Sequence, residues 1–142
     1  MAWLKSLADK EPPEPENPIG TVVIGNLRPD LHETAKEMVR KSLKKAGFKT
    51  VDVGKGTAPE AFALKAKEVN ADIVAASINT SAAKNNLLQL SSALEAAGLK
   101  GKIIFMIGGA VITKGDADAI GALYGKNRDE AVTIATTAIK KK

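Results

Sequence analysis

The chain has 142 residues, 44% hydrophobic and 26% charged, which is enough to bury the core of one globular domain. It contains no cysteine and a single histidine, His32, so disulfides, thiolate metal sites and sites needing two imidazoles from one chain are excluded. The net charge is +5, but the lysines mostly occupy outward helix positions without interleaved aromatic residues, so we expect no nucleic-acid partner.

The first nineteen residues are expected to form a short helix, either part of a separate helical unit or docked on the body, and a linker before the main domain. Trp3, Leu4 and Leu7 recur at helical spacing and predict a short helix, in a stretch too short and charged for a signal peptide. Residues 11–18, EPPEPENP, predict a stiff extended linker, because proline fixes φ and lacks a donor. No apolar run is long enough to span a membrane. We therefore expect a cytoplasmic protein without a membrane partner, whose domain covers residues 20–142.

Strands and helices alternate after the linker. Strands are predicted over residues 21–25, 49–53, 73–77, 102–107 and 123–124. Helices are predicted over residues 31–46, 58–69, 84–97, 116–120 and 128–140. Thr57 and Glu60 have the spacing of a capping box at the start of the second helix, with Pro59 in its first turn.

This alternation predicts right-handed crossovers and a parallel sheet covered on both faces. The expected fold is α/β: a flavodoxin-like (Rossmann-like) three-layer sandwich around a five-stranded parallel sheet of strand order 2-1-3-4-5. Ligands of such folds bind beyond the carboxyl ends of the strands, at the switch point between strands 1 and 3. The loops at residues 26–34, 77–85 and 108–113 are expected to converge there.

Polar residues in these loops are candidates for a binding site. Asp30 and His32 flank Leu31, and a carboxylate beside an imidazole can bind one ring nitrogen and leave the other for a metal. The alternative is that Asp30 is a helix N-cap and His32 an exposed loop residue. Ser77 could simply cap a turn, and Gly108-Gly109 could simply form a tight one.

Three motifs in register resemble the cobalamin-binding domains of corrinoid methyltransferases and cobalamin-dependent mutases. That family carries D-x-H-x-x-G, then S-x-L, then G-G; this chain has DLHETA from Asp30, SIN from Ser77, and Gly108-Gly109. The segments VVIGNLRPDLHETAKEMV, KKAGFKTVDVG, ADIVAAS and IGGAVIT resemble the corrinoid proteins of methyl-transfer systems. The resemblance covers about residues 20–140.

The resemblance implies a role for each matching residue. His32 would replace the dimethylbenzimidazole of cobalamin as the lower axial ligand of cobalt, and Asp30 would bind the other ring nitrogen. Ser77 would contact the displaced benzimidazole tail. Gly108 and Gly109 would line the tail's channel, where a Cβ would collide with the nucleotide.

Two positions depart from the family motifs. Ala35 stands at the motif glycine and adds a methyl group, and Asn79 places a polar group at the motif leucine. Such changes would lower affinity, select a different corrinoid or mark a chain that has lost cobalamin. Because the Asp30–His32 pair is intact, retained binding is the favoured interpretation.

Three functions follow from this interpretation. The first is a corrinoid methyl carrier, which works with partner methyltransferases and is not a complete enzyme; such carriers usually have a helical bundle before this domain, for which residues 1–19 are too few. The second is the small subunit of an adenosylcobalamin-dependent mutase. The third is a cofactor-free interaction module.

Phosphoryl signalling is disfavoured, because the first and third strands end in Gly25-Asn26 and Ser77-Ile78, without carboxylates.

Overall fold

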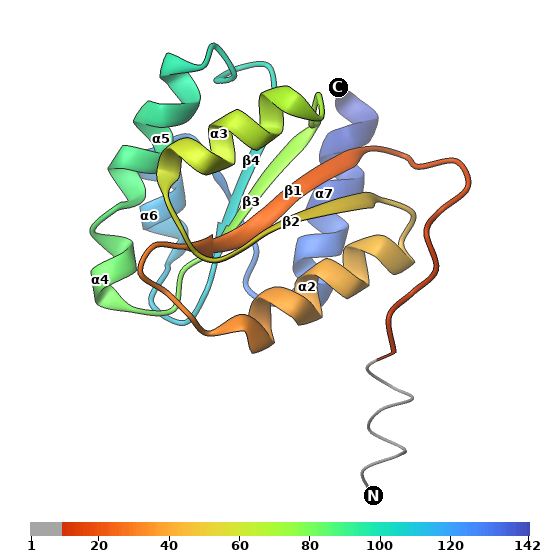
Figure 1. The fold of residues 1–142 in the computed structure, drawn as a ribbon, viewed down its shortest axis with the longest axis horizontal. Helices are drawn as coiled ribbons and strands as arrows, with labels where there is room; N and C mark the ends of the chain where they lie inside the picture. Colours follow the sequence, from red (N-terminus) through yellow and green to blue (C-terminus); the bar gives the residue numbers. More distant parts are fainter. Residues whose placement is uncertain (1–9) are drawn as a thin grey trace, which may run out of the picture.

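The computed structural model describes residues 10–142, so the helix predicted around Trp3, Leu4 and Leu7 lies outside the described residues. The strands are β1 (Thr21–Leu27), β2 (Lys49–Thr57), β3 (Ile73–Ser77), β4 (Ile104–Gly108) and β5 (Leu123–Tyr124). The helices are α2 (Glu33–Lys45), α3 (Pro59–Glu68), α4 (Ser81–Lys84), α5 (Leu87–Ala96), α6 (Lys114–Ala119) and α7 (Arg128–Lys141). The strands pair in parallel in the order β2-β1-β3-β4-β5, which confirms the predicted fold (Figure 1).

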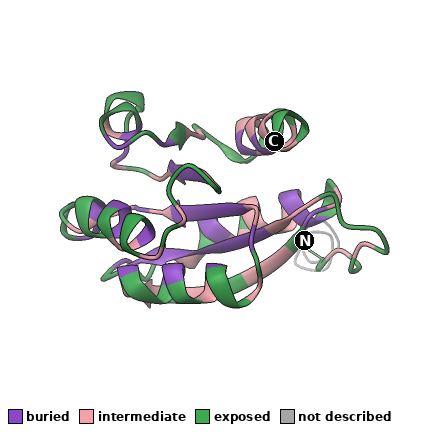
Figure 2. Cartoon of the chain, turned by 90° about the horizontal axis from the view of Figure 1, so that it is seen from above, coloured by how far each residue is buried: buried purple, intermediate pink, exposed green. Residues whose placement is uncertain are grey.

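Two cores form because side chains alternate between the faces of each strand. Val22 and Ile24 of β1 belong to the core under α2 and α7, whereas Val23 belongs to the core under α3 and α5. Figure 2 shows the buried strands between the two helical layers. Among residues 10–142, none of the helices is long and apolar enough to cross a membrane.

The predicted capping box at Thr57 is wrong. Thr57 is the last residue of β2, which extends past residue 53 because Leu27 of β1 still pairs with Thr57. The Thr57 hydroxyl donates to the Val53 carbonyl oxygen at 2.9 Å, and the N-cap of α3 is Ala58, without a side-chain bond. The tertiary strand pairing therefore overrides the local helix-start signal.

The helix predicted over residues 84–97 is divided into α4 and α5. The Thr80 hydroxyl caps α4 by accepting from the Ala83 amide at 3.1 Å, so helical structure starts earlier than predicted. Asn86 then occupies the N-cap of α5, and its Nδ2 donates to the Arg28 carbonyl oxygen at 2.7 Å. The division between α4 and α5 therefore lies where the Asn86 side chain bonds to a segment that is distant in sequence.

The proline-rich linker passes beside the carboxyl-terminal end of α2 (Figure 1). Glu11 accepts from Arg40 Nη1 at 2.9 Å and from Lys44 Nζ at 2.6 Å, and Glu14 pairs with Lys44 at 2.9 Å. The hydrogen bonds from Arg40 and then Lys44 lower the pKa of Glu11 to about 2. The linker is therefore attached by ion pairs, beyond the stiffness that its prolines predict.

Replacing Glu11 with glutamine is expected to increase the motion of residues 14–17 with little loss of global stability, because exposed ion pairs contribute at most about 1 kcal/mol. The lowered pKa of Glu11 means that its contribution is complete above the ordinary value of 4.5 and is lost as pH falls toward about 2. Backbone ¹⁵N relaxation of the variant and of acidified wild type measures both effects. Glu16→Gln, outside these ion pairs, is the control, and equal motion in both variants would contradict the attachment.

Candidate functional site

The carboxyl ends of β1, β3 and β4 lie in one row. Asn26 pairs with Ser77, and Ser77 pairs with Gly108, so the three strands reach the same level before their loops begin. These are the loops expected to converge, and the structure brings them together at this edge of the sheet. As a result, three loops leave the sheet side by side: residues 26–34, which include His32, residues 77–85 and residues 108–113.

The first loop contains a buried carboxylate under an exposed imidazole. Asp30 is 0% exposed, whereas the side chain of His32 is 70% exposed. Asp30 Oδ1 accepts from the His32 backbone amide at 3.0 Å and lies 2.8 Å from His32 Nδ1. The N-cap of α2 is His32 rather than Asp30, so α2 begins at Glu33 instead of residue 31. The capping alternative for Asp30 is therefore wrong.

The second oxygen of Asp30 is also fully engaged. Oδ2 accepts from Asn79 N at 2.9 Å, from Asn79 Nδ2 at 2.8 Å and from Asn26 Nδ2 at 3.2 Å. Burial acts to raise the pKa of Asp30, but the hydrogen bonds, first those from His32, outweigh it and the net pKa is lowered. An ionised carboxylate only accepts hydrogen bonds, so Nδ1 of His32 carries the hydrogen. In the neutral ring, Nε2 then presents its lone pair away from Asp30.

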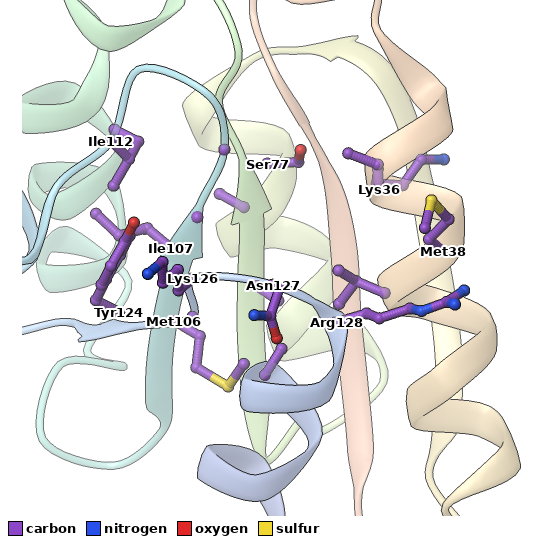
Figure 3. A pocket seen from close by; sticks show the side chains of 18 of the residues that line it. Lys36, Met38, Ser77, Met106, Ile107, Ile112, Tyr124, Lys126, Asn127 and Arg128 are labelled. Carbon is purple, nitrogen blue, oxygen red and sulfur yellow. The ribbon is translucent and has the colours of Figure 1, made fainter.

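A cavity of about 680 Å³ lies beside this pair, between α2 and α7 and over the sheet (Figure 3). Five of the predicted site residues line it: Ala35, Ser77, Asn79, Gly108 and Gly109. Asp30 and His32 are not among its lining residues. Met38, Ala75 and Met106 give the wall an apolar character, and Lys126 and Arg128 lie where α7 begins.

The two glycines are needed by the protein's own backbone. A Cβ on Gly108 would lie 2.6 Å from the Gly125 carbonyl oxygen. Gly109 has φ +132°, and its Cβ would overlap the backbone of Ile78. Glycine is therefore required at both positions whatever occupies the cavity. The expected collision between a Cβ and a bound nucleotide stays a prediction.

The sequence did not single out Lys36 or Asn26. Lys36 is 0% exposed, lines the cavity and pairs with Asp52 at 2.7 Å and Glu37 at 3.1 Å. Burial acts to lower the pKa of Lys36, but the hydrogen bonds that it donates to Asp52 and then Glu37 outweigh this effect, so the net pKa is raised and the ammonium stays charged. Lys36 is an exception to the outward placement of helix lysines. The signal in the sequence was Glu33, three residues earlier on the same helix and therefore at interacting spacing.

Asn26 links the strand row to the histidine loop. Its Nδ2 donates to Asp30 and to the His32 carbonyl oxygen at 3.1 Å. Its Oδ1 is buried and has no hydrogen-bond partner among the described residues. Buried polar atoms are normally paired, so this oxygen marks a site whose hydrogen bonding is incomplete in the protein alone.

The chemistry of these residues fits a corrinoid cofactor. The exposed imidazole nitrogen of His32 could supply one donor to a metal that the organic ring already holds. The neighbouring cavity has room for an organic group, with an apolar wall and polar groups at its edge. The added methyl of Ala35 and the amide of Asn79 leave this cavity open.

Comparisons with known proteins agree with this fit. Trimethylamine corrinoid protein 2 of Methanosarcina acetivorans is 42% identical over 123 residues, which cover 86% of this chain and 57% of that protein. The structure of a cobalamin-binding protein from Desulfitobacterium hafniense matches with a TM-score of 0.79 and 27% identity, covering 83% of this chain and 58% of that one. The monomethylamine corrinoid protein of Methanosarcina barkeri shares the fold, with a TM-score of 0.81 and 22% identity over 87% of this chain and 60% of that one.

The chain spans a little over half the length of these proteins. Residues 20–135 match the B12 binding domain as a family. The match includes all three loops of the site and the cavity between α2 and α7. The expectation of a cobalamin cofactor, first based on three short motifs, is confirmed at the level of the family: the chain belongs to the B12 binding domain family.

Proposed function

We propose that this chain is the corrinoid-binding part of a methyl-carrier protein in a methyltransferase system, with His32 as the lower axial ligand of cobalt. The carrying observation is the Asp30–His32 pair, in which a buried carboxylate binds Nδ1 and leaves Nε2 exposed. A single oriented nitrogen beside a large cavity suits a metal that arrives inside an organic cofactor. The intact pair also disfavours a cofactor-free module.

Each residue has a defined task in this proposal. Asp30 fixes the ring orientation and tautomer of His32 and raises its strength as a donor. Ser77 presents its hydroxyl to the tail within the cavity. Gly108 and Gly109 have no side chains, so they leave room for the tail along the same wall. Lys36 remains a paired cation at the cavity edge. When bound, the corrinoid supplies the chemistry, the acceptance and release of a methyl group at cobalt.

The comparisons favour a methyl carrier over a mutase subunit. The curated relatives that cover most of this chain are named as trimethylamine and dimethylamine corrinoid proteins. A methyl carrier exchanges its methyl group with other proteins, so partner methyltransferases are part of the proposal. Methylated amines are the class of methyl donor that these relatives suggest.

Reconstitution tests the proposal directly. The protein, grown with [¹⁵N]histidine so that only His32 is labelled, is incubated with hydroxocobalamin, desalted, assayed for bound cobalt and then reduced by one electron to cobalt(II) with a chemical reductant. We expect a coloured, stoichiometric complex whose cobalt(II) paramagnetic resonance is split into doublets by ¹⁵N. Triplet splitting would mean that the cofactor's own benzimidazole remains on cobalt, which would contradict axial ligation by His32. A colourless protein without cobalt would contradict corrinoid binding itself.

A further inference from the structure

The amide of Asn79 connects the buried carboxylate to the cavity wall. Its Nδ2 donates to Asp30 Oδ2 at 2.8 Å and to Ser77 Oγ at 3.1 Å. Its Oδ1 accepts from the Ala110 backbone amide at 2.9 Å. Its own backbone amide donates to Asp30 Oδ2 at 2.9 Å. One side chain therefore bonds to the loops after β1 and β4 and to the end of β3.

Two of these partners line the cavity and one does not. Ser77 and Ala110 belong to the cavity wall, whereas Asp30 lies outside it under His32. A group in the cavity that displaces Ala110 or forms a hydrogen bond with the Ser77 hydroxyl also displaces the Asn79 amide, because this amide bonds to both residues. A shift of that amide changes the length of the hydrogen bond that it donates to Asp30 Oδ2. It therefore changes the position of the Asp30 carboxylate and the strength of its hydrogen bond with His32 Nδ1.

We propose that Asn79 is a positioning residue that couples occupancy of the cavity to the orientation of His32. This inference rests on the proposed function, because the cavity is taken to receive the corrinoid tail. A leucine at this position could contact a tail and would keep the backbone bond to Asp30, but its side chain has no donor for Asp30 and no acceptor for Ala110. The coupling is thus built from the amide that distinguishes this chain from the S-x-L motif.

A four-way comparison tests the coupling. Wild type and Asn79→Leu are each loaded with cobalamin and with cobinamide, a corrinoid that lacks the nucleotide tail. The readout is the fraction of cobalt(II) that shows ¹⁵N splitting from labelled His32. In wild type, we expect the equilibrium constant for histidine ligation to be about tenfold higher with the tail than without it, the size of one charge-assisted hydrogen bond. In Asn79→Leu, the two corrinoids should agree within about twofold.

Two further variants keep this test decisive. Asn79→Ser removes the amide but leaves a small polar side chain, so it serves if the leucine variant does not fold, and it should also lose the difference between corrinoids. Asn86→Leu removes another loop asparagine, which bonds to the Arg28 carbonyl oxygen and not to Asp30, and it should keep the wild-type difference. In ligand-free protein, amide exchange at Ala110 should accelerate in the Asn79 variants alone.

The outcomes separate the two proposals. Wild type without any ¹⁵N splitting would overturn the axial role of His32, and with it the premise of the coupling. Wild type that ligates cobalt through His32 equally with both corrinoids would overturn the coupling and leave the proposed function standing. A tail-dependent difference that persists in Asn79→Leu or Asn79→Ser would also overturn it.

Discussion

Replacing His32 with alanine is expected to abolish histidine ligation of cobalt and to leave the fold unchanged. The side chain is 70% exposed and makes its only described side-chain bond to Asp30, so little packing is lost. The backbone amide of residue 32 still donates to Asp30. Because the chain has a single histidine, no other side chain of the protein can supply an imidazole. We expect the affinity for cobalamin to fall by at least about tenfold. This is the lower end of the loss in affinity that follows when a residue supporting a metal ligand is removed.

Absorbance titration with hydroxocobalamin and cobalt(II) resonance measure the affinity and the ligation in the same samples. Leu31→Ala is the matched control, since Leu31 is the neighbouring exposed side chain and carries no ligand atom. It should retain the nitrogen splitting, and thermal unfolding should show that both variants are folded. An unchanged cobalt spectrum in His32→Ala would remove the basis for the axial ligand.

Replacing Gly109 with alanine is expected to destabilise the ligand-free protein by about 3 kcal/mol or more. Gly109 has φ +132°, and an added Cβ would overlap the carbonyl group and amide nitrogen of Ile78. The Ile78 amide also donates to the Gly108 carbonyl oxygen at 2.8 Å, so the two segments have little freedom to separate. Urea denaturation of the protein without corrinoid measures this loss directly.

Gly98→Ala separates the clash from backbone strain. Gly98 also has a positive φ, +74°, but a Cβ there would meet nothing within 4 Å. The expected cost is therefore only that of a left-handed residue, about 1 kcal/mol. Equal losses in the two variants would mean that the contact with Ile78 does not constrain Gly109. A full loss measured without ligand would show that the glycine serves the fold before it serves any cofactor.

The fold was accessible from the sequence because it follows from repeated local patterns. Apolar runs separated by helical segments predict a parallel sheet, and its strand order was correct. The errors occurred where tertiary contacts override local signals. Thr57 carries a capping pattern but pairs with Leu27, and the segment whose apolar spacing predicts one helix is divided at Asn86, which bonds to Arg28.

The candidate site was only partly accessible in the same way. Asp30 and His32 are two residues apart, so their contact depends on one turn of chain, and the prediction that they pair is confirmed. The bonds of Asn79 join segments that are distant in sequence, and they depend on how three loops meet. Asn79 was treated as an apolar pocket position, and the chemistry of its amide became visible only in three dimensions. The attachment of Glu11 to Arg40 was hidden for the same reason.

The alignment of Asn26, Ser77 and Gly108 in one row sets where the chain can tolerate changes in length. Inserting or deleting one residue within β1, β3 or β4 would turn every following side chain of that strand to the opposite face. Asn26 would leave Asp30, or Ser77 would leave Asn79, while much of the sheet could still form. Insertions beyond the row, in the turn between α6 and β5 for example, would leave these contacts in place. Engineering of this domain, such as grafting a reporter or recombining it with a relative, should therefore place its junctions outside the three strands.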